Sequence, residues 1–404
     1  STSSLASAKP AQTGQPDVLP GQYIVVFNDN VTDIDSVIQE LSLQHGASIE
    51  HAYHNALHGF AGAIPPGRLN DVKNDPRVAF VSEDARIYAL GRPGSIVIPQ
   101  PPQVTPTGIQ RIGADTSTST GNGIGVAVVD TGIDLKHPDL AANIVANTSC
   151  ITGKKTGADD NGHGTHVAGT IAALNNSIGV VGVAPQADLL AVKVLNAQGS
   201  GSWSSIICGL DWVTANAVAY NIKVANLSLG GGGTSDDNCG LTNNDALHQA
   251  ICRARDAGVT IVVAAGNSSA DTATSVPAAY DDAVITVSAL ADSDGTANGL
   301  GTSTSFGADD TFASFSNFSS EVDVAAPGVD ILSTWKGGGY STISGTSMAA
   351  PHVSGALAQF FEYHPGSAWT EARDALITSG EAMNSGHIDP SGVHPEGVLD
   401  ASSF

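Results

Sequence analysis

Short apolar runs alternate with longer helical stretches between residues 124 and 289, and this alternation is the feature that most constrains the fold. Several runs, such as 124–129 and 259–265, are continuously apolar, which is typical of strands buried on both faces of a parallel sheet. Such strands need helical connections that cover the sheet. We therefore expect an α/β domain over residues 108–404, with a largely parallel sheet flanked by helices. The stretches are 124–129, 167–174, 189–195, 206–219, 224–229, 246–257, 259–265 and 284–289.

Residues 21–90 show a different pattern, which predicts a second, smaller domain. A β-branched and aromatic strand at 23–27 precedes an amphipathic helix at 33–45 that stops at Gly46. Strands around 60–64 and 78–81 flank a second helix that contains Leu69 and Val72. With one weakly marked strand added, the order is β-α-β-β-α-β, which predicts a ferredoxin-like α+β unit.

Two segments lack such patterns. Residues 1–20 are rich in Ser, Ala, Pro and Gln, and we expect a disordered lead there. Residues 91–107 contain five prolines, which predicts a linker between the two domains.

The charge balance excludes some partners. Among 404 residues there are 16 Lys and Arg against 39 Asp and Glu, a net charge of -23. Nucleic acids and anionic membranes both need a basic face, so we expect neither as a partner. No apolar run reaches 18 residues, so we expect no membrane span. No signal-peptide pattern follows Ser1; either the protein is cytosolic or its signal has been removed, and we favour removal.

Four cysteines, Cys150, Cys208, Cys239 and Cys252, are compatible with two disulfides in an oxidising compartment. Four cysteines allow three connectivities, and buried free thiols are the alternative. Our working pairing is Cys239–Cys252, which are close in sequence, and Cys150–Cys208. No C-x-x-C occurs, so the common zinc and thioredoxin patterns are absent.

Three motifs carry residue types that act together in acyl transfer. Asp130 ends an apolar strand, His163 lies in N-G-H-G-T-H at a glycine-rich helix start, and Ser347 lies in G-T-S-M-A where a loop becomes a helix. A serine hydroxyl needs an adjacent base, a histidine supplies it, and a carboxylate holds the histidine tautomer. The order Asp-His-Ser is the subtilisin order, whereas α/β-hydrolases run Ser-Asp-His and use G-x-S-x-G.

Over residues 21–404 the chain resembles secreted subtilisin-type serine proteases that retain an N-terminal inhibitory propeptide. The resemblance implies a catalytic triad of Asp130, His163 and Ser347. It implies an oxyanion hole formed by Asn267 and the backbone of Ser347, assisted by Thr346. It also implies that residues 21–90 act as an intramolecular chaperone and inhibitor, that protein and peptide substrates are the other partners, and that the enzyme is a secreted monomer.

The resemblance also implies where a substrate would lie. One side of the groove would be Ser228, Leu229 and Gly230; the other would be Gly199 and Gly201, followed by Trp203 as a lid over the P4 pocket. Glycines at these places leave room for a peptide to add as a strand. Ala264, Ala265 and Gly266 would wall a P1 pocket for a large apolar side chain.

A structural calcium site is implied in the same way. Its ligands would be the carbonyls of Leu174, Ile178 and Val180 with the side chains of Asn176, Asp139 and Gln103, a set of oxygens that suits a hard cation.

By the same resemblance the propeptide would end as a strand in the active site, which places the first self-cleavage between Leu90 and Gly91. A small P2 residue, Ala89, and an apolar P4 residue, Ile87, agree with this register. Two alternatives from other classes are a catalytically silent binding protein of the same fold and a serine esterase. A substituted triad residue would indicate the first, and G-x-S-x-G with the other chain order would indicate the second.

Overall fold

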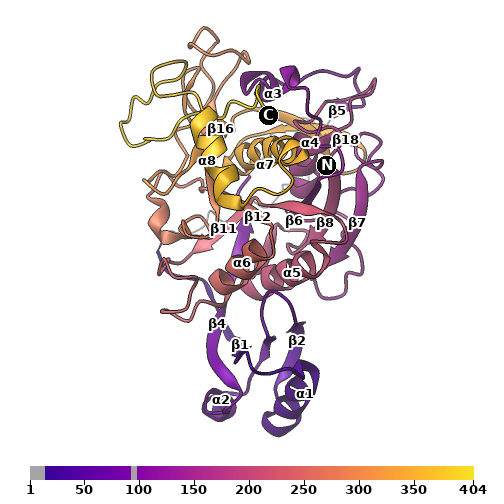
Figure 1. Cartoon of the computed structure of the whole chain (residues 1–404), viewed down its shortest axis with the longest axis vertical. Coiled ribbons are helices and arrows are strands. Elements are labelled where there is room, and N and C mark those ends of the chain that lie inside the picture. Colours follow the sequence, from indigo (N-terminus) through magenta and orange to yellow (C-terminus); the bar gives the residue numbers. More distant parts are fainter. Residues whose placement is uncertain (1–13, 92–97) are drawn as a thin grey trace, which may run out of the picture.

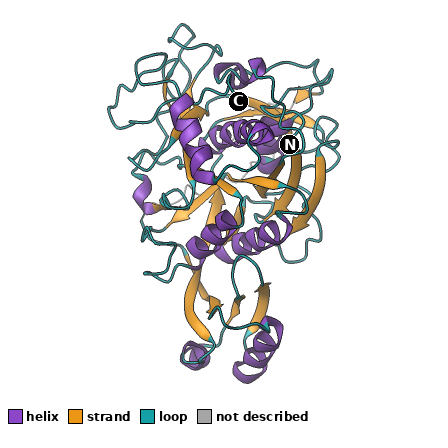
Figure 2. Ribbon diagram, in the orientation of Figure 1, coloured by secondary structure: helices purple, strands orange, loops and turns teal. Residues whose placement is uncertain are grey.

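The structure is a computed structural model that describes residues 14–91 and 98–404. A small N-terminal domain lies at one end of a much larger α/β domain, and strand β4 runs from the first into the second (Figure 1). In Figure 2 the strands of the large domain form a central layer between helices.

The N-terminal domain is an antiparallel sheet in the order β4-β1-β3-β2, and the ferredoxin-like prediction is confirmed. Asp33 caps helix α1 by accepting from Ser36 N, and Gly46 ends the helix in the left-handed region at φ 69°. The elements are β1 (Val18–Phe27), α1 (Ile34–His45), β2 (Ser48–Tyr53), β3 (Gly59–Ala63), η1 (Pro66–Arg68), α2 (Leu69–Lys73) and β4 (Val78–Ala89).

Two expectations for this domain were wrong in part. The disordered lead was predicted to extend to residue 20, but strand β1 already begins at Val18, where it pairs with Ala85; residues 1–13 lie outside the described part. The last strand was predicted at 78–81, but β4 continues for 12 residues to Ala89. Its second half pairs with the large domain, a contact that residues 21–90 alone do not reveal.

The large domain is built on a mainly parallel sheet, as predicted, in the order β15-β14-β12-β10-β6-β8-β7, with β16 also beside β14. Only β15 pairs antiparallel in this sheet. The elements are β5 (Ile98–Pro99), α3 (Thr107–Arg111), η2 (Ala114–Thr116), β6 (Gly125–Asp130), β7 (Ile144–Ser149), α4 (His163–Ala172), β8 (Asp188–Lys193), β9 (Ser200–Ser202), α5 (Trp203–Asn216), β10 (Ile222–Leu227), β11 (Leu229–Gly232), α6 (Ala246–Asp256), β12 (Thr260–Ala264), η3 (Thr272–Thr274), β13 (Ser275–Val276), β14 (Ile285–Ala291), β15 (Thr311–Phe312), β16 (Val324–Pro327), β17 (Ile331–Trp335), β18 (Gly339–Ile343), α7 (Thr346–Tyr363) and α8 (Trp369–Ser379).

Both faces of the central sheet are buried. Along β6, Val126 and Val128 belong to the apolar cluster that includes helices α4 and α7. Ala127 and Val129 belong to the cluster on the other face, with helices α5 and α6. This alternation follows from the two-residue period of a strand and explains why the sequence of β6 is apolar throughout.

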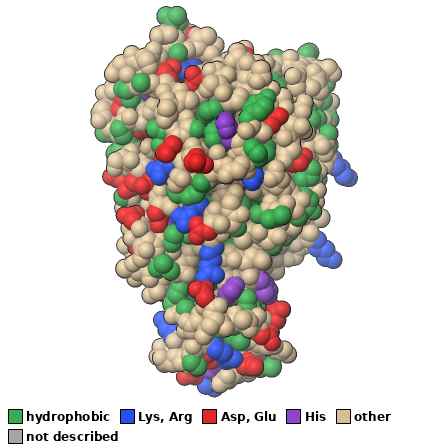
Figure 3. Space-filling model, viewed as in Figure 1, with side chains coloured by type: hydrophobic (Ala, Val, Ile, Leu, Met, Phe, Trp, Pro, Cys, Tyr) green, Lys and Arg blue, Asp and Glu red, His purple; other side chains and the backbone are tan. Residues whose placement is uncertain are grey.

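The linker prediction falls partly on residues 92–97, which lie outside the described part. Beyond them the chain is held in place: β5 pairs with β18, and Val104 bridges to Val180. Both predicted disulfides, Cys150–Cys208 and Cys239–Cys252, are present. Charged side chains on the face shown in Figure 3 are scattered, without a continuous basic surface. In the described parts of the chain, no helix has the length and apolar character that a membrane crossing requires.

The open face of the N-terminal sheet packs on helix α5. Ile24, Val26 and Tyr53 share one apolar cluster with Ile206 and Leu210 of that helix. The core of the large domain therefore continues into the N-terminal domain, and this burial stabilises their association.

Two buried carboxylates complete the contact between the domains. Asp211 of α5 accepts from the backbone N–H groups of His54, Asn55 and Ala56 at 3.0, 2.5 and 2.8 Å. In the opposite direction, Asp84 of β4 accepts from Ser204 N at 3.1 Å and Ser204 Oγ at 2.6 Å, at the start of α5. Each carboxylate is paired with neutral donors of the other domain, so the contact needs no opposite charges.

Replacing Asp211 by alanine should release the turn at residues 54–56, because its three backbone donors lose their acceptor. We expect hydrogen exchange of these amides in the intact chain to accelerate by about 10-fold or more, since a lost bond to a charged acceptor costs about 1.5–3 kcal/mol. Exchange read by mass spectrometry measures this. Asp35→Ala, which removes only an exposed ion pair with His54, is the matched control; equal exchange in both variants would contradict the assignment.

Candidate active site

Asp130 and His163 are brought together by the edge of the central sheet. Asp130 is the last residue of β6, and His163 is the first residue of α4. His163 Nδ1 lies 2.8 Å from Asp130 Oδ1 and 3.0 Å from Oδ2, and both side chains are buried. An ionised carboxylate can only accept, so Nδ1 carries the proton and Nε2 is free to act as a base. Nε2 has no hydrogen-bond partner in the structure.

Asp159 holds the two segments that carry this pair. It accepts from Thr131 Oγ1 at 2.9 Å, in the turn after β6, and from Gly162 N at 2.9 Å, before α4. Thr131 Oγ1 in turn accepts from Gly164 N at 2.9 Å. Burial raises the pKa of Asp159, while these hydrogen bonds oppose the shift. Sequence reasoning missed Asp159 as a site residue, although it lies four residues before His163.

Ser347 is the second residue of α7, next to the end of β4. Its hydroxyl donates to the carbonyl of Ser228 at 2.9 Å. The same carbonyl accepts from Leu90 N at 3.3 Å. The helix begins after Gly345, with φ 154°, and a Cβ there would lie 2.5 Å from the Leu90 carbonyl oxygen. Only glycine lets the Leu90 carbonyl approach the start of this helix.

A buried hydrogen-bond chain fixes Ser228 against Ser347. Ser228 Oγ donates to the carbonyl of Ser347 at 2.9 Å, Asn226 Nδ2 donates to Ser228 Oγ at 2.8 Å, and Ser354 Oγ donates to Asn226 Oδ1 at 2.9 Å. All four residues are fully buried. The chain joins the end of β10 to helix α7. We had not singled out Asn226 or Ser354 as site residues, because each looks like an ordinary polar residue within a strand or a helix.

Asn267 and Thr346 lie at the Leu90 carbonyl. Asn267 Nδ2 donates to Leu90 O. Asn267 Oδ1 accepts from both Thr346 N and Thr346 Oγ1, each at 2.9 Å. These two bonds fix the orientation of the amide, so Thr346 acts on the carbonyl through Asn267.

The end of β4 lies between two strands of the large domain. On one side it pairs with β11, where Ala89 is opposite Leu229 and Tyr88 is opposite Gly230. On the other side it pairs with β9, where Ile87 is opposite Gly201. Ala89 N also donates to Gly199 O at 2.9 Å. A Cβ at Gly201 would overlap the Val194 carbonyl, so this position needs glycine.

Two apolar side chains, one in β4 and one directly after it, lie at the predicted pockets. Leu90 is 6 % exposed, shares an apolar cluster with Ala264, and has Cδ1 against Gly230. Ala265 and Gly266 follow directly after β12, and Gly266 N donates to Thr346 Oγ1 at 3.1 Å. Ile87 is fully buried in the cluster that contains Trp203, the first residue of α5.

Gly91 lies against His163. A Cβ built on Gly91 would be 2.7 Å from His163 Cδ2 and 3.0 Å from Nε2. The Leu90–Gly91 peptide bond therefore lies between Asn267, which binds its carbonyl, and the free nitrogen of His163.

The residues expected to bind a cation also converge. Gln103 Nε2 lies 2.8 Å from Leu174 O and 3.5 Å from Val180 O, and Asn176 Nδ2 lies 2.7 Å from Asp139 Oδ1. Ile178 N donates to Asn176 Oδ1 at 2.7 Å. Asp139 is buried, and this burial raises its pKa.

The other motif histidines have structural contacts. His166 Nε2 bonds the carbonyls of Ile331 and Ser341 at 2.9 and 3.1 Å, and burial lowers its pKa to about 3. His352 Nδ1 bonds Met348 O at 2.8 Å, and burial lowers its pKa to about 4. Both stay neutral at physiological pH.

Two protein-family models match the chain: the subtilase family over residues 121–392 and the peptidase inhibitor I9 family over residues 22–89. The first covers more than half of the chain. The chain belongs to the subtilase family. It is accordingly a serine endopeptidase made as a zymogen, and residues 22–89 belong to its I9 inhibitor propeptide.

Relatives agree with this membership along most of the chain. An alkaline protease of Alkalihalobacillus alcalophilus is 36 % identical over 385 residues, which cover 92 % of this chain and 89 % of the relative. Subtilisin E of Bacillus subtilis is 38 % identical over 367 residues, covering 88 % and 84 %. The extracellular serine proteinase of a Thermus species is 37 % identical over 402 residues, covering 93 % and 89 %.

A solved structure of a cold-adapted subtilisin-like serine proteinase has the same fold. It matches with a TM-score of 0.60 and 32 % identity, and covers 74 % of this chain and 98 % of that one.

Replacing Asn226 by leucine should lower the activity of this subtilase, because Ser228 Oγ loses its donor and β10 loses its bond to Ser354 of α7. We expect kcat/KM of the processed enzyme on a peptide substrate to fall by about 5- to 150-fold, since a buried unsatisfied partner costs about 1–3 kcal/mol. Ser354→Ala, which removes only the outer bond, should have the smaller effect. Equal activity in Asn226→Leu and the unchanged enzyme would exclude a role for this chain of bonds.

Proposed function

We propose that this subtilase cuts its own chain between Leu90 and Gly91 and then cleaves other proteins after large apolar residues. The placement of the Leu90–Gly91 bond, with its carbonyl on Asn267 and its leaving side on His163, is the observation that supports this most strongly. None of Asp130, His163 and Ser347 is substituted, and Asp130 is hydrogen-bonded to His163, which argues against a silent binding protein.

The chemistry proceeds by acyl transfer. Rotation of the Ser347 hydroxyl from the Ser228 carbonyl to His163 Nε2 activates the oxygen, which attacks the Leu90 carbonyl carbon while Nε2 takes the proton. Asn267 Nδ2 and the backbone N–H of Ser347 stabilise the oxyanion. His163 then gives the proton to the Gly91 nitrogen as the C–N bond breaks, and Asp130 stabilises the imidazolium. Water releases Leu90 by the same path in reverse.

The same groove sets the substrate preference. A substrate strand between β9 and β11 would make backbone hydrogen bonds that any sequence can offer. The fit of its buried side chains would therefore decide which sequences are cleaved. Leu90 beside Ala264 and Gly230 indicates a large apolar P1 residue, and Ile87 beside Trp203 indicates an apolar P4 residue. Burying one leucine contributes about 1.5–3 kcal/mol, enough to fix the register.

We further propose that Asp139 and its neighbours bind a structural calcium ion. The residues fit: one buried carboxylate, two amide side chains and carbonyl groups converge, and the amide nitrogen of Gln103 now bonds carbonyl oxygens that a cation would otherwise bridge. Turning an amide by 180° presents its oxygen in place of its nitrogen. When bound, the ion would add stability to the folded state and take no part in the acyl transfer.

Export to the outside of the cell completes the proposal. Two disulfides suit an oxidising compartment, and one relative is named extracellular. The acidic surface would keep a single copy dispersed in solution.

N-terminal sequencing of the processed chain tests the self-cleavage site. The new N-terminus should be Gly91, Ser347→Ala should accumulate uncut precursor, and Leu90→Asp should slow the cut by at least about 10-fold, because a charge would enter an apolar pocket. Leu90→Met, of similar size and polarity, should be cut normally. A start several residues away, with Leu90→Asp cut at the usual rate, would show that the register is wrong.

Melting of the Ser347→Ala precursor with and without a chelator tests the calcium site. At about 100 times its Kd, a ligand adds about 2.7 kcal/mol, so the Tm of a chain of this length should fall by about 3–4 °C in chelator. Asp139→Ala should abolish most of this difference, whereas Asp115→Ala, at an exposed position, should keep it. A Tm that is the same in calcium and in chelator would refute the site.

The salt dependence of propeptide inhibition tests how the two domains hold together. Residues 1–90 carry 5 basic against 10 acidic residues, and residues 91–404 carry 11 against 29, so both are acidic. The contact is apolar and backbone-mediated. Among the described residues, one ion pair joins the two domains, Arg253–Asp29. We expect the inhibition constant to hold or tighten between about 0.1 and about 1 M salt. Steep weakening would mean that charge attraction dominates.

A further inference from the structure

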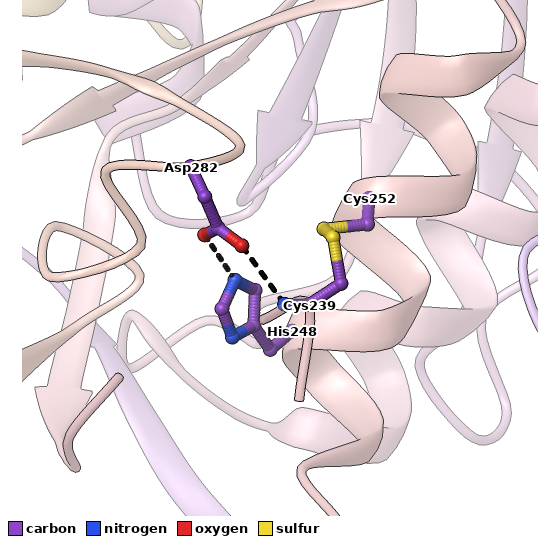
Figure 4. Close-up of side chains that lie close together, drawn as sticks. All are labelled: Cys239, His248, Cys252 and Asp282. Atoms are coloured by element: carbon purple, nitrogen blue, oxygen red, sulfur yellow. Dashed lines mark hydrogen bonds and ion pairs between the residues drawn. A yellow bond between two sulfur atoms is a disulfide. The ribbon is translucent and has the colours of Figure 1, made fainter. Parts of the chain in front are cut away.

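The Cys239–Cys252 disulfide lies beside a histidine and a carboxylate that take no part in catalysis (Figure 4). One atom from each of Cys239, His248, Cys252 and Asp282 can be chosen so that all four lie within 4.8 Å of one another. His248 and Cys252 are four residues apart on α6, which places them on one helix face. Cys239 comes from the loop before α6, and Asp282 from the loop before β14.

These side chains are held in a fixed arrangement. His248 is fully buried, stacks on the Tyr280 ring at 3.9 Å between centroids, and has Nε2 at 2.6 Å from Asp282 Oδ1. Asp282 Oδ2 accepts from Cys239 N at 2.8 Å, which orients the carboxylate toward the disulfide. The four groups therefore need little movement to meet at one point.

A second carboxylate, that of Asp236, lies near the ring nitrogen of His248 that does not face Asp282. Its Nδ1 makes no hydrogen bond in the structure, and Asp236 Oδ1 lies 3.4 Å away. A histidine that binds a metal through one nitrogen commonly donates its other N–H to a carboxylate, which fixes the tautomer. Asp236 is in position to accept that bond.

The second disulfide lacks these neighbours. Among the described residues, the two clusters of metal-ligating side chains include neither Cys150 nor Cys208. In the described part of the chain, a histidine and an aspartate therefore lie beside the Cys239–Cys252 disulfide alone, and the Cys150–Cys208 disulfide serves as a control within the same molecule.

We propose that Cys239, His248, Cys252 and Asp282 bind one zinc ion when the two cysteines are thiols, so that the disulfide and the metal are alternative ways to tie the same loop. Two thiolates, an imidazole and a carboxylate form a tetrahedral set typical of zinc. The ion takes the place of the proton between His248 Nε2 and Asp282, this proton is replaced by one on Nδ1, which faces Asp236, and the ion separates the sulfurs. Neither step uses the protease site, so the inference is independent of the proposed function.

The chemistry balances with a reductant of the thiol or phosphine class. A dithiol gives two electrons and two protons to the Cys239–Cys252 bond, which becomes two thiols, and the dithiol is oxidised to its own disulfide. Zinc binding then releases the two thiol protons to water. In a chain that has not yet been oxidised, the same site would order the loop before the disulfide forms and would slow its oxidation, because a metal-bound thiolate is less available for exchange.

The test uses the full-length Ser347→Ala precursor, reduced under native conditions with a phosphine. Cobalt(II), a spectroscopic probe for zinc, should give tetrahedral bands and a thiolate charge-transfer band at one equivalent, and zinc should displace it. Zinc should slow alkylation of Cys239 and Cys252 by at least about 10-fold, read by mass spectrometry, while Cys150 and Cys208 react at unchanged rates. The unreduced precursor should show neither effect.

Variants separate a metal site from two nearby thiols. His248→Phe keeps a ring against Tyr280 but removes the ligand, and should weaken cobalt binding by at least about 10-fold; Cys150→Ser with Cys208→Ser should leave it unchanged. If His248→Phe fails to fold, the alkylation pattern of the Ser347→Ala precursor still tests the site, because zinc should protect Cys239 and Cys252 alone. A reduced, folded precursor without tetrahedral bands, or with all four cysteines equally protected by zinc, would overturn the proposal.

Discussion

The active site depends on the burial of the central parallel sheet. Helices cover both faces, so the strand ends are the part of the sheet where polar side chains can meet. Asp130 ends β6, Ser228 follows β10, and Asn267 comes three residues after β12. Because β6, β10 and β12 are parallel neighbours, their carboxyl ends reach the same edge. Helices α4 and α7 bring His163 and Ser347 to that edge.

The same edge explains why the propeptide can end there. Strand β4 adds between β9 and β11 through backbone hydrogen bonds, which are open to any extended chain. The propeptide makes contacts that a short substrate does not make. Its sheet packs on α5, its Asp84 accepts from Ser204, and its turn at 54–56 donates to Asp211. Neither of these contacts involves the Leu90–Gly91 bond, where we propose that the chain is cut. Apolar burial on α5 holds the two acidic domains together, and these carboxylates can lie in the contact because they bind N–H and O–H groups.

Polar residues behind the site were harder to predict than the site itself. The motifs around Asp130, His163 and Ser347 are long, and each has a type that the chemistry demands. Asp159, Asn226 and Ser354 support them through hydrogen bonds between segments that are distant in sequence. Asn226 and Ser354 are 128 residues apart. A single sequence gives no sign that such residues meet, because their types are common in turns, strands and helices alike.

The sequence by itself determined the α/β class, the ferredoxin-like domain before it and the three motifs, because periodicity and glycine-rich turns are local properties of the chain. The cut between Leu90 and Gly91 was predicted from the resemblance to subtilisin-type proteases, whose propeptides end as a strand in the active site, and it stays a prediction. The sequence marked strand β2 only weakly, because its residues Ser48, Glu50 and His51 are polar and stay partly exposed at the sheet edge. It did not show that one disulfide lies against His248 and Asp282, or that Asp236 stands behind the imidazole. Those facts depend on contacts between distant segments, which only the packing of helices on both sheet faces brings into register.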